Sequence, residues 1–159
     1  WLKEHPTDVA ARMYQAGIYL VGKQNKAAIE QYQAVLQQNP KNVSALNNLA
    51  WLYQQEKDPR ALEYAEKANQ LAPENPAILD TLGWMLVEQG NTKRGLPLLQ
   101  KASSLEPKNS AIQYHVVLGL VKSGEKAKAL SELEQLIAAG GTSPTIDEAK
   151  ALLKQLRGQ

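Results

Sequence analysis

The chain has 159 residues, of which 43% are hydrophobic and 21% are charged. This balance predicts a folded chain with a continuous core and excludes an intrinsically disordered one. The formal net charge is only +2 at pH 7, and Lys and Arg are interleaved with Asp and Glu, so the clustered basic face that phosphate contacts require is missing. We therefore expect no nucleic acid among the partners.

The absence of cysteine excludes disulfides, thiolate metal sites and a cysteine nucleophile, and it is compatible with a reducing or an oxidising compartment. No apolar run approaches the roughly 18 residues that a membrane span needs, and no basic-then-apolar leader precedes the first helix, so we expect no direct membrane insertion. The chain opens at Trp1 in the middle of a pattern, which indicates a fragment of a longer protein.

Catalytic motifs are missing from the sequence. The two histidines, His5 and His115, belong to no spaced metal motif, and neither a Gly-rich phosphate loop nor a Gly-x-Ser-x-Gly elbow is present. The carboxylates fall on amphipathic helical patterns, where they form a solvated face. The sequence therefore predicts a non-enzymatic chain with no cofactor and no metal.

The strongest pattern is a repeat marked by prolines at Pro6, Pro40, Pro73 and Pro107, with gaps of 34, 33 and 34 residues. Self-similarity at this period predicts stacked helical hairpins, none of which can bury its apolar face alone. In chain order we expect the tail of a preceding repeat at 1–8, four repeats at 9–42, 43–75, 76–109 and 110–143, and a capping helix at 144–159.

Within each repeat, apolar residues at positions 4, 7, 8 and 11 share one face of the first helix, and small residues at 8, 20 and 27 let helices approach closely. The second repeat has one residue deleted near Asp58, in the turn between its helices. In the third, Gly83 and Gly95 are the small residues, and Pro97 lies near the start of the second helix, which we expect to survive it.

The fourth repeat is degenerate, because Val117 replaces the small residue at position 8 and Gly140 and Gly141 stand where proline is expected. After it, Thr145 and Glu148 predict a capping box at the start of the last helix. That helix carries one apolar stripe, formed by Ile146, Ala149, Leu152, Leu153 and Leu156, which is expected to close the array.

This arrangement resembles the tetratricopeptide repeat over nearly the whole chain. The resemblance rests on a large residue at position 4, Leu-Gly at 7 and 8, Tyr at 11, Ala at 20 and 27, and Pro at 32. It implies an all-α, right-handed superhelical solenoid of antiparallel helix pairs with a C-terminal capping helix. It also implies a scaffold for protein–protein interaction, whose partner is a protein or a peptide.

Three stretches, at 45–51, 79–84 and 113–115, also resemble bacterial tetratricopeptide lipoproteins associated with exopolysaccharide and PEP-CTERM/exosortase systems. This second resemblance implies an envelope-associated scaffold of a Gram-negative bacterium, anchored by lipid on a missing N-terminal part. The location is then periplasmic or envelope-associated, and otherwise cytoplasmic.

In the tetratricopeptide family the first helices line a concave groove, which presents positions 2, 5, 9 and 12, with 6 and 13 at its margins. Carried over by position, the candidate groove residues of this chain are Met13, Gly17, Asn47, Asn48, Trp51, Asp80, Trp84, Tyr114 and Leu118. Only Lys122 adds a cation nearby, so a clamp for acidic C-terminal tails is not expected.

Three features of this groove have two interpretations each. Trp51 and Trp84 share position 9 of their repeats. One interpretation is that their rings are neighbours and anchor a ligand, and the other is that each ring lies flat on an adjacent helix. Asn48 matches the asparagine that holds a peptide backbone, or it is solvated or bonded locally. His115 is a weaker ligand-binding candidate than a packing residue.

The sequence also leaves the functional surface open. One hypothesis is a binding module that uses the groove. The alternative is a structural spacer in a longer superhelix, with contacts through its ends or through convex helices such as 93–105. Truncation of the array leaves an apolar face exposed, which further predicts a homodimer of this fragment through its truncated N-terminal edge, for reasons unconnected with its biological role.

Overall fold

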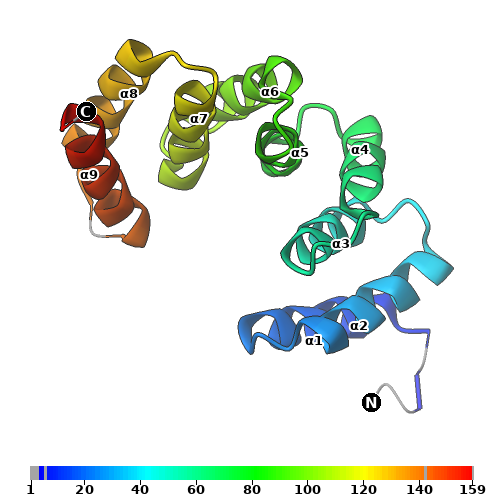
Figure 1. The fold of residues 1–159 in the computed structure, drawn as a ribbon. Helices are drawn as coiled ribbons and strands as arrows, with labels where there is room; N and C mark the ends of the chain where they lie inside the picture. Colours follow the sequence, from blue (N-terminus) through cyan, green and yellow to red (C-terminus); the bar gives the residue numbers. More distant parts are fainter. Residues whose placement is uncertain (1–3, 6, 142, 159) are drawn as a thin grey trace. The chain divides into compact units, whose positions relative to one another are not determined.

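The computed structural model describes residues 4, 5, 7–141 and 143–158, and the described chain contains nine α-helices and no strand (Figure 1). The all-α fold of paired helices that the sequence predicts is confirmed. The helices are α1 (Val9–Val21), α2 (Asn25–Gln38), α3 (Val43–Gln55), α4 (Ala61–Leu71), α5 (Pro76–Glu88), α6 (Thr92–Leu105), α7 (Ser110–Lys122), α8 (Lys126–Ala138) and α9 (Pro144–Arg157).

The helices fall into two compact units. Unit 1 is Trp1–Pro73 and holds α1 to α4, and unit 2 is Glu74–Gln159 and holds α5 to α9. Within each unit every helix packs against the next one along the chain.

A short polar residue begins the first helix of every pair. The side chains of Asp8, Asn42, Asn75, Asn109 and Ser143 each accept a hydrogen bond from a backbone N–H of the first turn, at the starts of α1, α3, α5, α7 and α9. Such caps satisfy donors that have no partner inside the helix. The same start signal therefore recurs at the repeat period.

The turn inside each hairpin is also repeated. Lys23 and Lys57 both have φ of 55°, and the equivalent turns of unit 2 use Gly90 at 83° and Gly124 at 82°. Glycine adopts this left-handed conformation at little cost, whereas a lysine is strained there. Asp58 lies in one of these turns, so the single deletion falls between helices, as the sequence predicts.

Unit 1 is held by small residues where its helices cross and by two buried tyrosines. Ala16, Ala28 and Ala50 are fully buried. Tyr32 and Tyr53 are almost fully buried. The Tyr53 hydroxyl accepts a hydrogen bond from Gln33 Nε2 at 2.8 Å, which ties α3 to α2. Burying a tyrosine ring is favourable when its hydroxyl finds such a partner.

Unit 2 contains a closer helix crossing, between α5 and α6. A β-carbon placed on Gly95 would lie 2.5 Å from the carbonyl oxygen of Gly83 and 2.9 Å from the backbone N of Val87. These distances are shorter than any van der Waals contact, so the tight packing predicted at Gly95 is confirmed. Helix α6 continues through Pro97, whose side chain is exposed, as expected from the sequence.

The C-terminal part of unit 2 has one continuous core. Val117, Leu120, Leu133 and Leu136 are buried between α7 and α8, and α9 covers them beside α8 (Figure 1). The stripe predicted on the capping helix is confirmed: Ile146, Ala149 and Leu156 are buried, and Leu152 and Leu153 are partly buried against the same core.

The predicted capping box at Thr145 and Glu148 is wrong. Helix α9 begins earlier, at Pro144, and its cap is Ser143, whose Oγ accepts the N–H of Ile146 at 3.3 Å. Proline fits the first helical position because its missing N–H would have no partner there. Of the predicted tail at 1–8, residues 1–3 and 6 lie outside the described residues.

Candidate binding surfaces

The predicted groove residues of unit 2 meet on the adjacent first helices α5 and α7. We call this set the unit 2 face: Asp80, Trp84, Tyr114, His115, Leu118 and Lys122. Asp80 and Trp84 stand one turn apart on α5, and Tyr114, His115 and Leu118 follow on α7, which packs against α5. The helical spacing i, i+4 places the two α5 side chains on one side of that helix.

The centre of the unit 2 face is an imidazole held in place by two neighbours. The Nδ1 atom of His115 lies 2.8 Å from Asp80 Oδ1 and 3.0 Å from Oδ2, and its ring stacks on Trp84 with centroids 4.8 Å apart and planes 9° apart. Since a carboxylate only accepts, Nδ1 carries the hydrogen. Nε2 has no hydrogen-bond partner within the described part of the chain, so it is left to meet a ligand or water.

Two further side chains complete this surface around Trp84. The Lys122 ammonium lies 5.8 Å from the centre of the Trp84 ring, within the range of a cation–π contact. Trp84 and Tyr114 are both partly buried against the core of unit 2. Burial raises the pKa of the Tyr114 hydroxyl above its ordinary value of 10.0, and the negative charge of Glu148 on α9 acts in the same direction.

The predicted groove residues of unit 1 lie on α1 and α3. Asn48 Nδ2 donates to the Tyr32 hydroxyl at 3.0 Å, so this amide is bonded locally. Its neighbour Asn47 has an Oδ1 atom that is shielded from solvent and has no hydrogen-bond partner in the described residues. Trp51 is 43% exposed. Its ring belongs to unit 1 and that of Trp84 to unit 2, so their predicted contact stays a prediction.

Met13 and Gly17 line an open hollow of about 440 Å³ on α1, together with Tyr14, Ile18 and Val21. No atom lies within 4 Å of where a β-carbon on Gly17 would stand. Tyr14, Ile18 and Val21 were not predicted as surface residues from the sequence. Their spacing along one side of the helix is the signal that could have found them.

A second hollow, of about 360 Å³, lies on the other side of unit 2, where α6, α7 and α8 come together. Serines and charged residues line most of it, with two apolar side chains at its base: Gln100, Ser103, Ser104, Val116, Leu120, Lys128, Ser131 and Glu132. This surface overlaps the convex helix 93–105 of the alternative hypothesis, but its hollow was not predicted.

The link between Asp80 and His115 was also missed, although both residues were considered. They are 35 residues apart, which is one residue more than the repeat of 34. The Asp80 side chain on α5 therefore contacts a residue one position further along the next repeat, on α7. Among the described residues, no three His, Asp or Glu side chains are grouped so that they could hold a metal ion. None of the helices in this part of the chain is long and apolar enough to cross a membrane.

Family models described as "Tetratricopeptide repeat" match residues 2–42, 22–76 and 86–153. Among curated proteins, none matches the sequence. Several solved structures have the same fold at low sequence identity. This similarity establishes the fold of the chain but not its function.

A tetratricopeptide repeat protein from Parabacteroides merdae ATCC 43184 aligns with a TM-score of 0.82 and 16% identity, over 98% of this chain and 61% of that one. This chain thus spans less than two thirds of that protein. TTC0263, a protein of Thermus thermophilus, gives a TM-score of 0.77 at 18% identity, over 99% and 86%. YrrB, described as having an unusual peptide-binding site, gives 0.72 at 22%, over 86% and 71%.

The matched segments cover most of both units, and the repeated caps, turns and small residues at helix crossings recur at the period of those segments. The chain belongs to the tetratricopeptide repeat family.

Proposed function

We propose that this chain is a non-catalytic scaffold that binds an extended peptide or protein segment on the unit 2 face. The observation that carries the proposal is the Trp84 ring, which is only partly buried and is held by the stacked ring of His115, itself bonded to Asp80. A ring that is already oriented loses little entropy when a ligand packs on it, and this preorganisation favours binding.

The chemistry of the unit 2 face favours a ligand with apolar or aromatic side chains. Tyr114, which is partly buried against the same core as Trp84, adds aromatic surface, and Leu118 follows it by one turn on α7. His115 Nε2 offers one polar contact to a peptide backbone. Lys122 is accompanied by the carboxylates of Asp80 and Glu148, so an acidic ligand meets repulsion as well as attraction. YrrB, whose fold is similar, is described as having a peptide-binding site.

We further propose that the groove residues of unit 1 form a contact surface of their own. Met13, Gly17 and Trp51 would contribute to it, whereas the Oδ1 of Asn47 is shielded from solvent and would accept a peptide N–H only after its side chain turns outwards. Asn48 would contribute through Oδ1, because Nδ2 already donates to Tyr32.

Selection of peptides from a random displayed library, followed by calorimetric titration of the best binder, tests this function. We expect Trp84→Ala to weaken binding about thirtyfold, the effect of losing an aromatic hot spot of about 2 kcal/mol. Trp51→Ala should weaken it less if the ligand reaches unit 1. The matched control is Leu105→Ala, an exposed apolar side chain on α6 that lines neither surface, and circular dichroism establishes equal helicity.

The hollow between α6, α7 and α8 favours a second candidate function, that of a spacer or assembly segment whose partners bind the second helices. Ser103→Trp would fill this hollow and block such a partner. A loss of binding in Ser103→Trp, with Trp84→Ala unchanged, would transfer the function from the unit 2 face to this surface.

We also propose, from the sequence resemblance alone, that the protein works in a bacterial envelope or exopolysaccharide system. Fractionation of the source bacterium, with an antibody against this chain, tests the location. Recovery in the envelope fraction is expected, and recovery in the cytosol alone would contradict it.

A further inference from the structure

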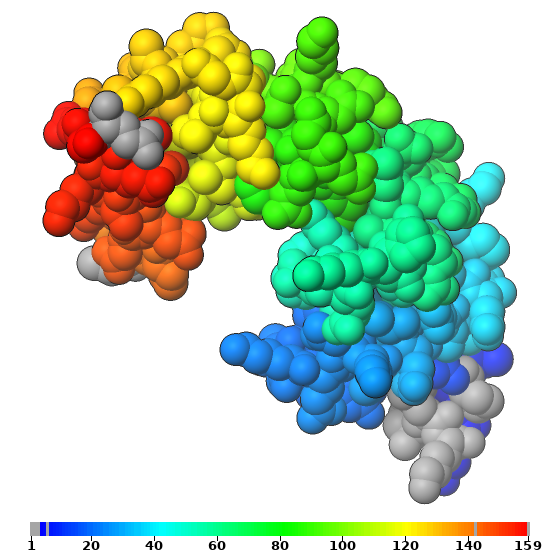
Figure 2. All heavy atoms as spheres, viewed as in Figure 1, coloured from blue at the N-terminus to red at the C-terminus, as the bar shows by residue number. Residues whose placement is uncertain are grey.

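Helix α1 carries an apolar stripe that no other part of the described chain covers. Tyr14, Ile18 and Val21 follow at i, i+4 and i+7 and are 74%, 47% and 88% exposed. The blue surface of α1 in Figure 2 borders solvent along the edge of unit 1. Other exposed large hydrophobic side chains in the described residues stand singly on three different helices: Trp51, Leu71 and Leu105.

The equivalent stripe on the other first helices shows what such a surface does. On α3 the equivalents of Tyr14 and Ile18 are Asn48, which bonds to Tyr32 of α2, and Leu52, which is fully buried. On α9 the stripe is likewise buried, because its residues Ala149 and Leu156 pack against the core of unit 2. The α1 stripe is therefore a helix-packing surface that no helix of the described chain covers.

Charge does not oppose the approach of a second copy of α1. The only charged residue of this helix is Arg12, whose Nη1 donates to Gln31 of α2 at 2.8 Å. Two copies of the stripe would therefore meet with apolar surface on both sides and without like charges, so desolvation costs little.

Shape adds a second reason for pairing. The side chain missing at Gly17 leaves the open hollow of α1, and the projecting ring of Tyr14 stands at i−3 beside it. In an antiparallel pair, Tyr14 of each helix faces the Gly17 hollow of the other, whereas in a parallel pair Tyr14 would face Tyr14. A knob and a hole on the same helix thus make α1 complementary to itself.

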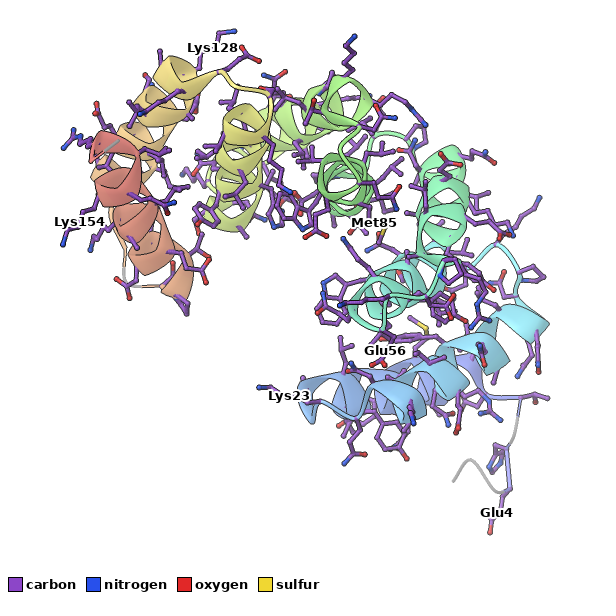
Figure 3. All side chains as sticks on the ribbon, viewed as in Figure 1. Glu4, Lys23, Glu56, Met85, Lys128 and Lys154 are labelled. Atoms are coloured by element: carbon purple, nitrogen blue, oxygen red, sulfur yellow. The ribbon has the colours of Figure 1, made fainter. Side chains whose placement is uncertain are left out.

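The other end of the chain offers no match for this stripe. The outer side of α9 is polar, with Asp147, Lys150, Lys154 and Arg157 exposed, and Lys154 points away from the helices of unit 2 (Figure 3). A head-to-tail contact would bury these charges against apolar side chains, which is costly. Of the two end helices in the described residues, α1 carries an apolar outer stripe and α9 a polar one, so the stripe of one copy is matched by the stripe of another.

We propose that the protein forms a symmetric homodimer through an antiparallel α1–α1 pair, in which Tyr14 of each copy fills the Gly17 hollow of the other. Because both copies use the same patch, the interface closes with two-fold symmetry and does not grow into a filament. This inference does not rest on the proposed ligand-binding function.

Sedimentation equilibrium of the 159-residue chain, from micromolar to millimolar concentration, tests the dimer. We expect a reversible monomer–dimer equilibrium that Ile18→Glu weakens at least about tenfold, because the substitution places a charge in the apolar contact. Val21→Glu, at a more exposed position, should act in the same way. Leu105→Glu is the matched control, since Leu105 is 44% exposed and lies on α6, and it should leave the equilibrium unchanged.

Gly17→Leu tests the knob-and-hole contact. The added side chain meets no atom of its own copy, so the monomer keeps its fold, but it fills the hollow that Tyr14 of the partner needs. We expect the dimer to weaken. A dimer unchanged by Gly17→Leu would overturn the pairing of Tyr14 with Gly17, and a monomer at all concentrations, or a dimer that resists Ile18→Glu, would overturn the interface. The unit 2 variants of the ligand test leave this readout unaffected, so the dimer and the ligand site on the unit 2 face fail separately.

Discussion

The hairpins α3–α4 and α5–α6 are built on the same two repeat positions but differ in how closely their helices approach. In unit 1 these positions hold Ala50 and Ala61, whereas in unit 2 they hold Gly83 and Gly95. Without side chains, the two backbones of α5 and α6 come into direct contact at this crossing. Glycine at these two positions thus permits a backbone contact that a β-carbon would block, while the repeat stays the same.

The α3–α4 hairpin, which has alanine at both positions, is held by contacts between aromatic rings. Tyr53 and Tyr64 meet edge to face with centroids 5.3 Å apart, and the Arg60 guanidinium lies 4.3 Å from the centre of the Tyr53 ring. Edge-to-face pairs and cation–π contacts stabilise such a cluster beyond its buried area. Unit 1 therefore depends on side-chain contacts where unit 2 depends on backbone contact.

The largest predicted effect is at the close crossing. Gly95→Ala places a methyl group 2.5 Å from a backbone oxygen, and the rigid neighbours force the helices apart. We expect a loss of about 2–3 kcal/mol in the free energy of unfolding, after the gain in helix propensity is counted.

Urea denaturation measures this loss, and Gly17→Ala is its control. Gly17 is also helical but has no neighbouring atom, so that substitution should stabilise the fold by about 0.5–1 kcal/mol. Equal changes in the two variants would show that α5 and α6 are not in contact through their backbones.

The hairpin turns give the next effect. Gly90→Ala forces a β-carbon into the left-handed conformation and should destabilise the protein by about 1 kcal/mol. The reverse change in unit 1, Lys57→Gly, relieves the same strain and should stabilise the fold by up to about 1 kcal/mol. Thermal unfolding of both variants checks the opposite signs, and shifts of the same sign would refute the strain at these turns.

Tyr53→Phe tests how far unit 1 depends on its rings. We expect the free energy of unfolding to fall by about 1 kcal/mol, because Gln33 Nε2 loses its acceptor in a partly buried position. Tyr14→Phe is the matched control, since Tyr14 is largely exposed, and it should change the free energy of unfolding little. A Tyr53→Phe variant as stable as the original protein would mean that the ring alone holds the hairpin.

The smallest effect concerns pH. Hydrogen bonds from the side chain and backbone of Arg60 lower the pKa of Asp58 from 3.8 to about 2. A carboxylate with a lowered folded-state pKa contributes stability that is present above its unfolded-state value and is lost as pH falls towards the folded-state value.

The melting temperature should therefore fall between about pH 4 and pH 2, and fall less in Asp58→Asn. Asp147→Asn is the control, because Asp147 is 81% exposed and lies 3.9 Å from Lys150, so its contact is weak. An unchanged pH profile in Asp58→Asn would exclude this contact from the acid sensitivity of unit 1.

The repeat period and the spacing of small residues were sufficient to predict helical hairpins, because a period near 34 leaves few other folds. Side-chain partners were not predictable to the same degree. The bond from Asn48 to Tyr32 and that from His115 to Asp80 depend on how each helix is rotated against the next, which a one-dimensional pattern does not state.

The cap of α9 illustrates a different limit. Ser143 and Thr145 both suit an N-cap, and the choice between them is made by Pro144, which is stable as the first helical residue. For the uncovered stripe of α1, the pattern was present in the sequence, but its exposure follows only once the neighbouring helices are placed.

The polar caps at Asp8, Asn42, Asn75, Asn109 and Ser143 have a consequence for how such a chain changes over evolutionary time. Each hairpin carries its own start signal, so a duplication or loss of one whole repeat leaves every remaining helix with an intact beginning. A gene of this kind can be lengthened or shortened in steps of one repeat, and a smaller length change leaves every cap beside its helix when it falls in a turn, as it does near Asp58.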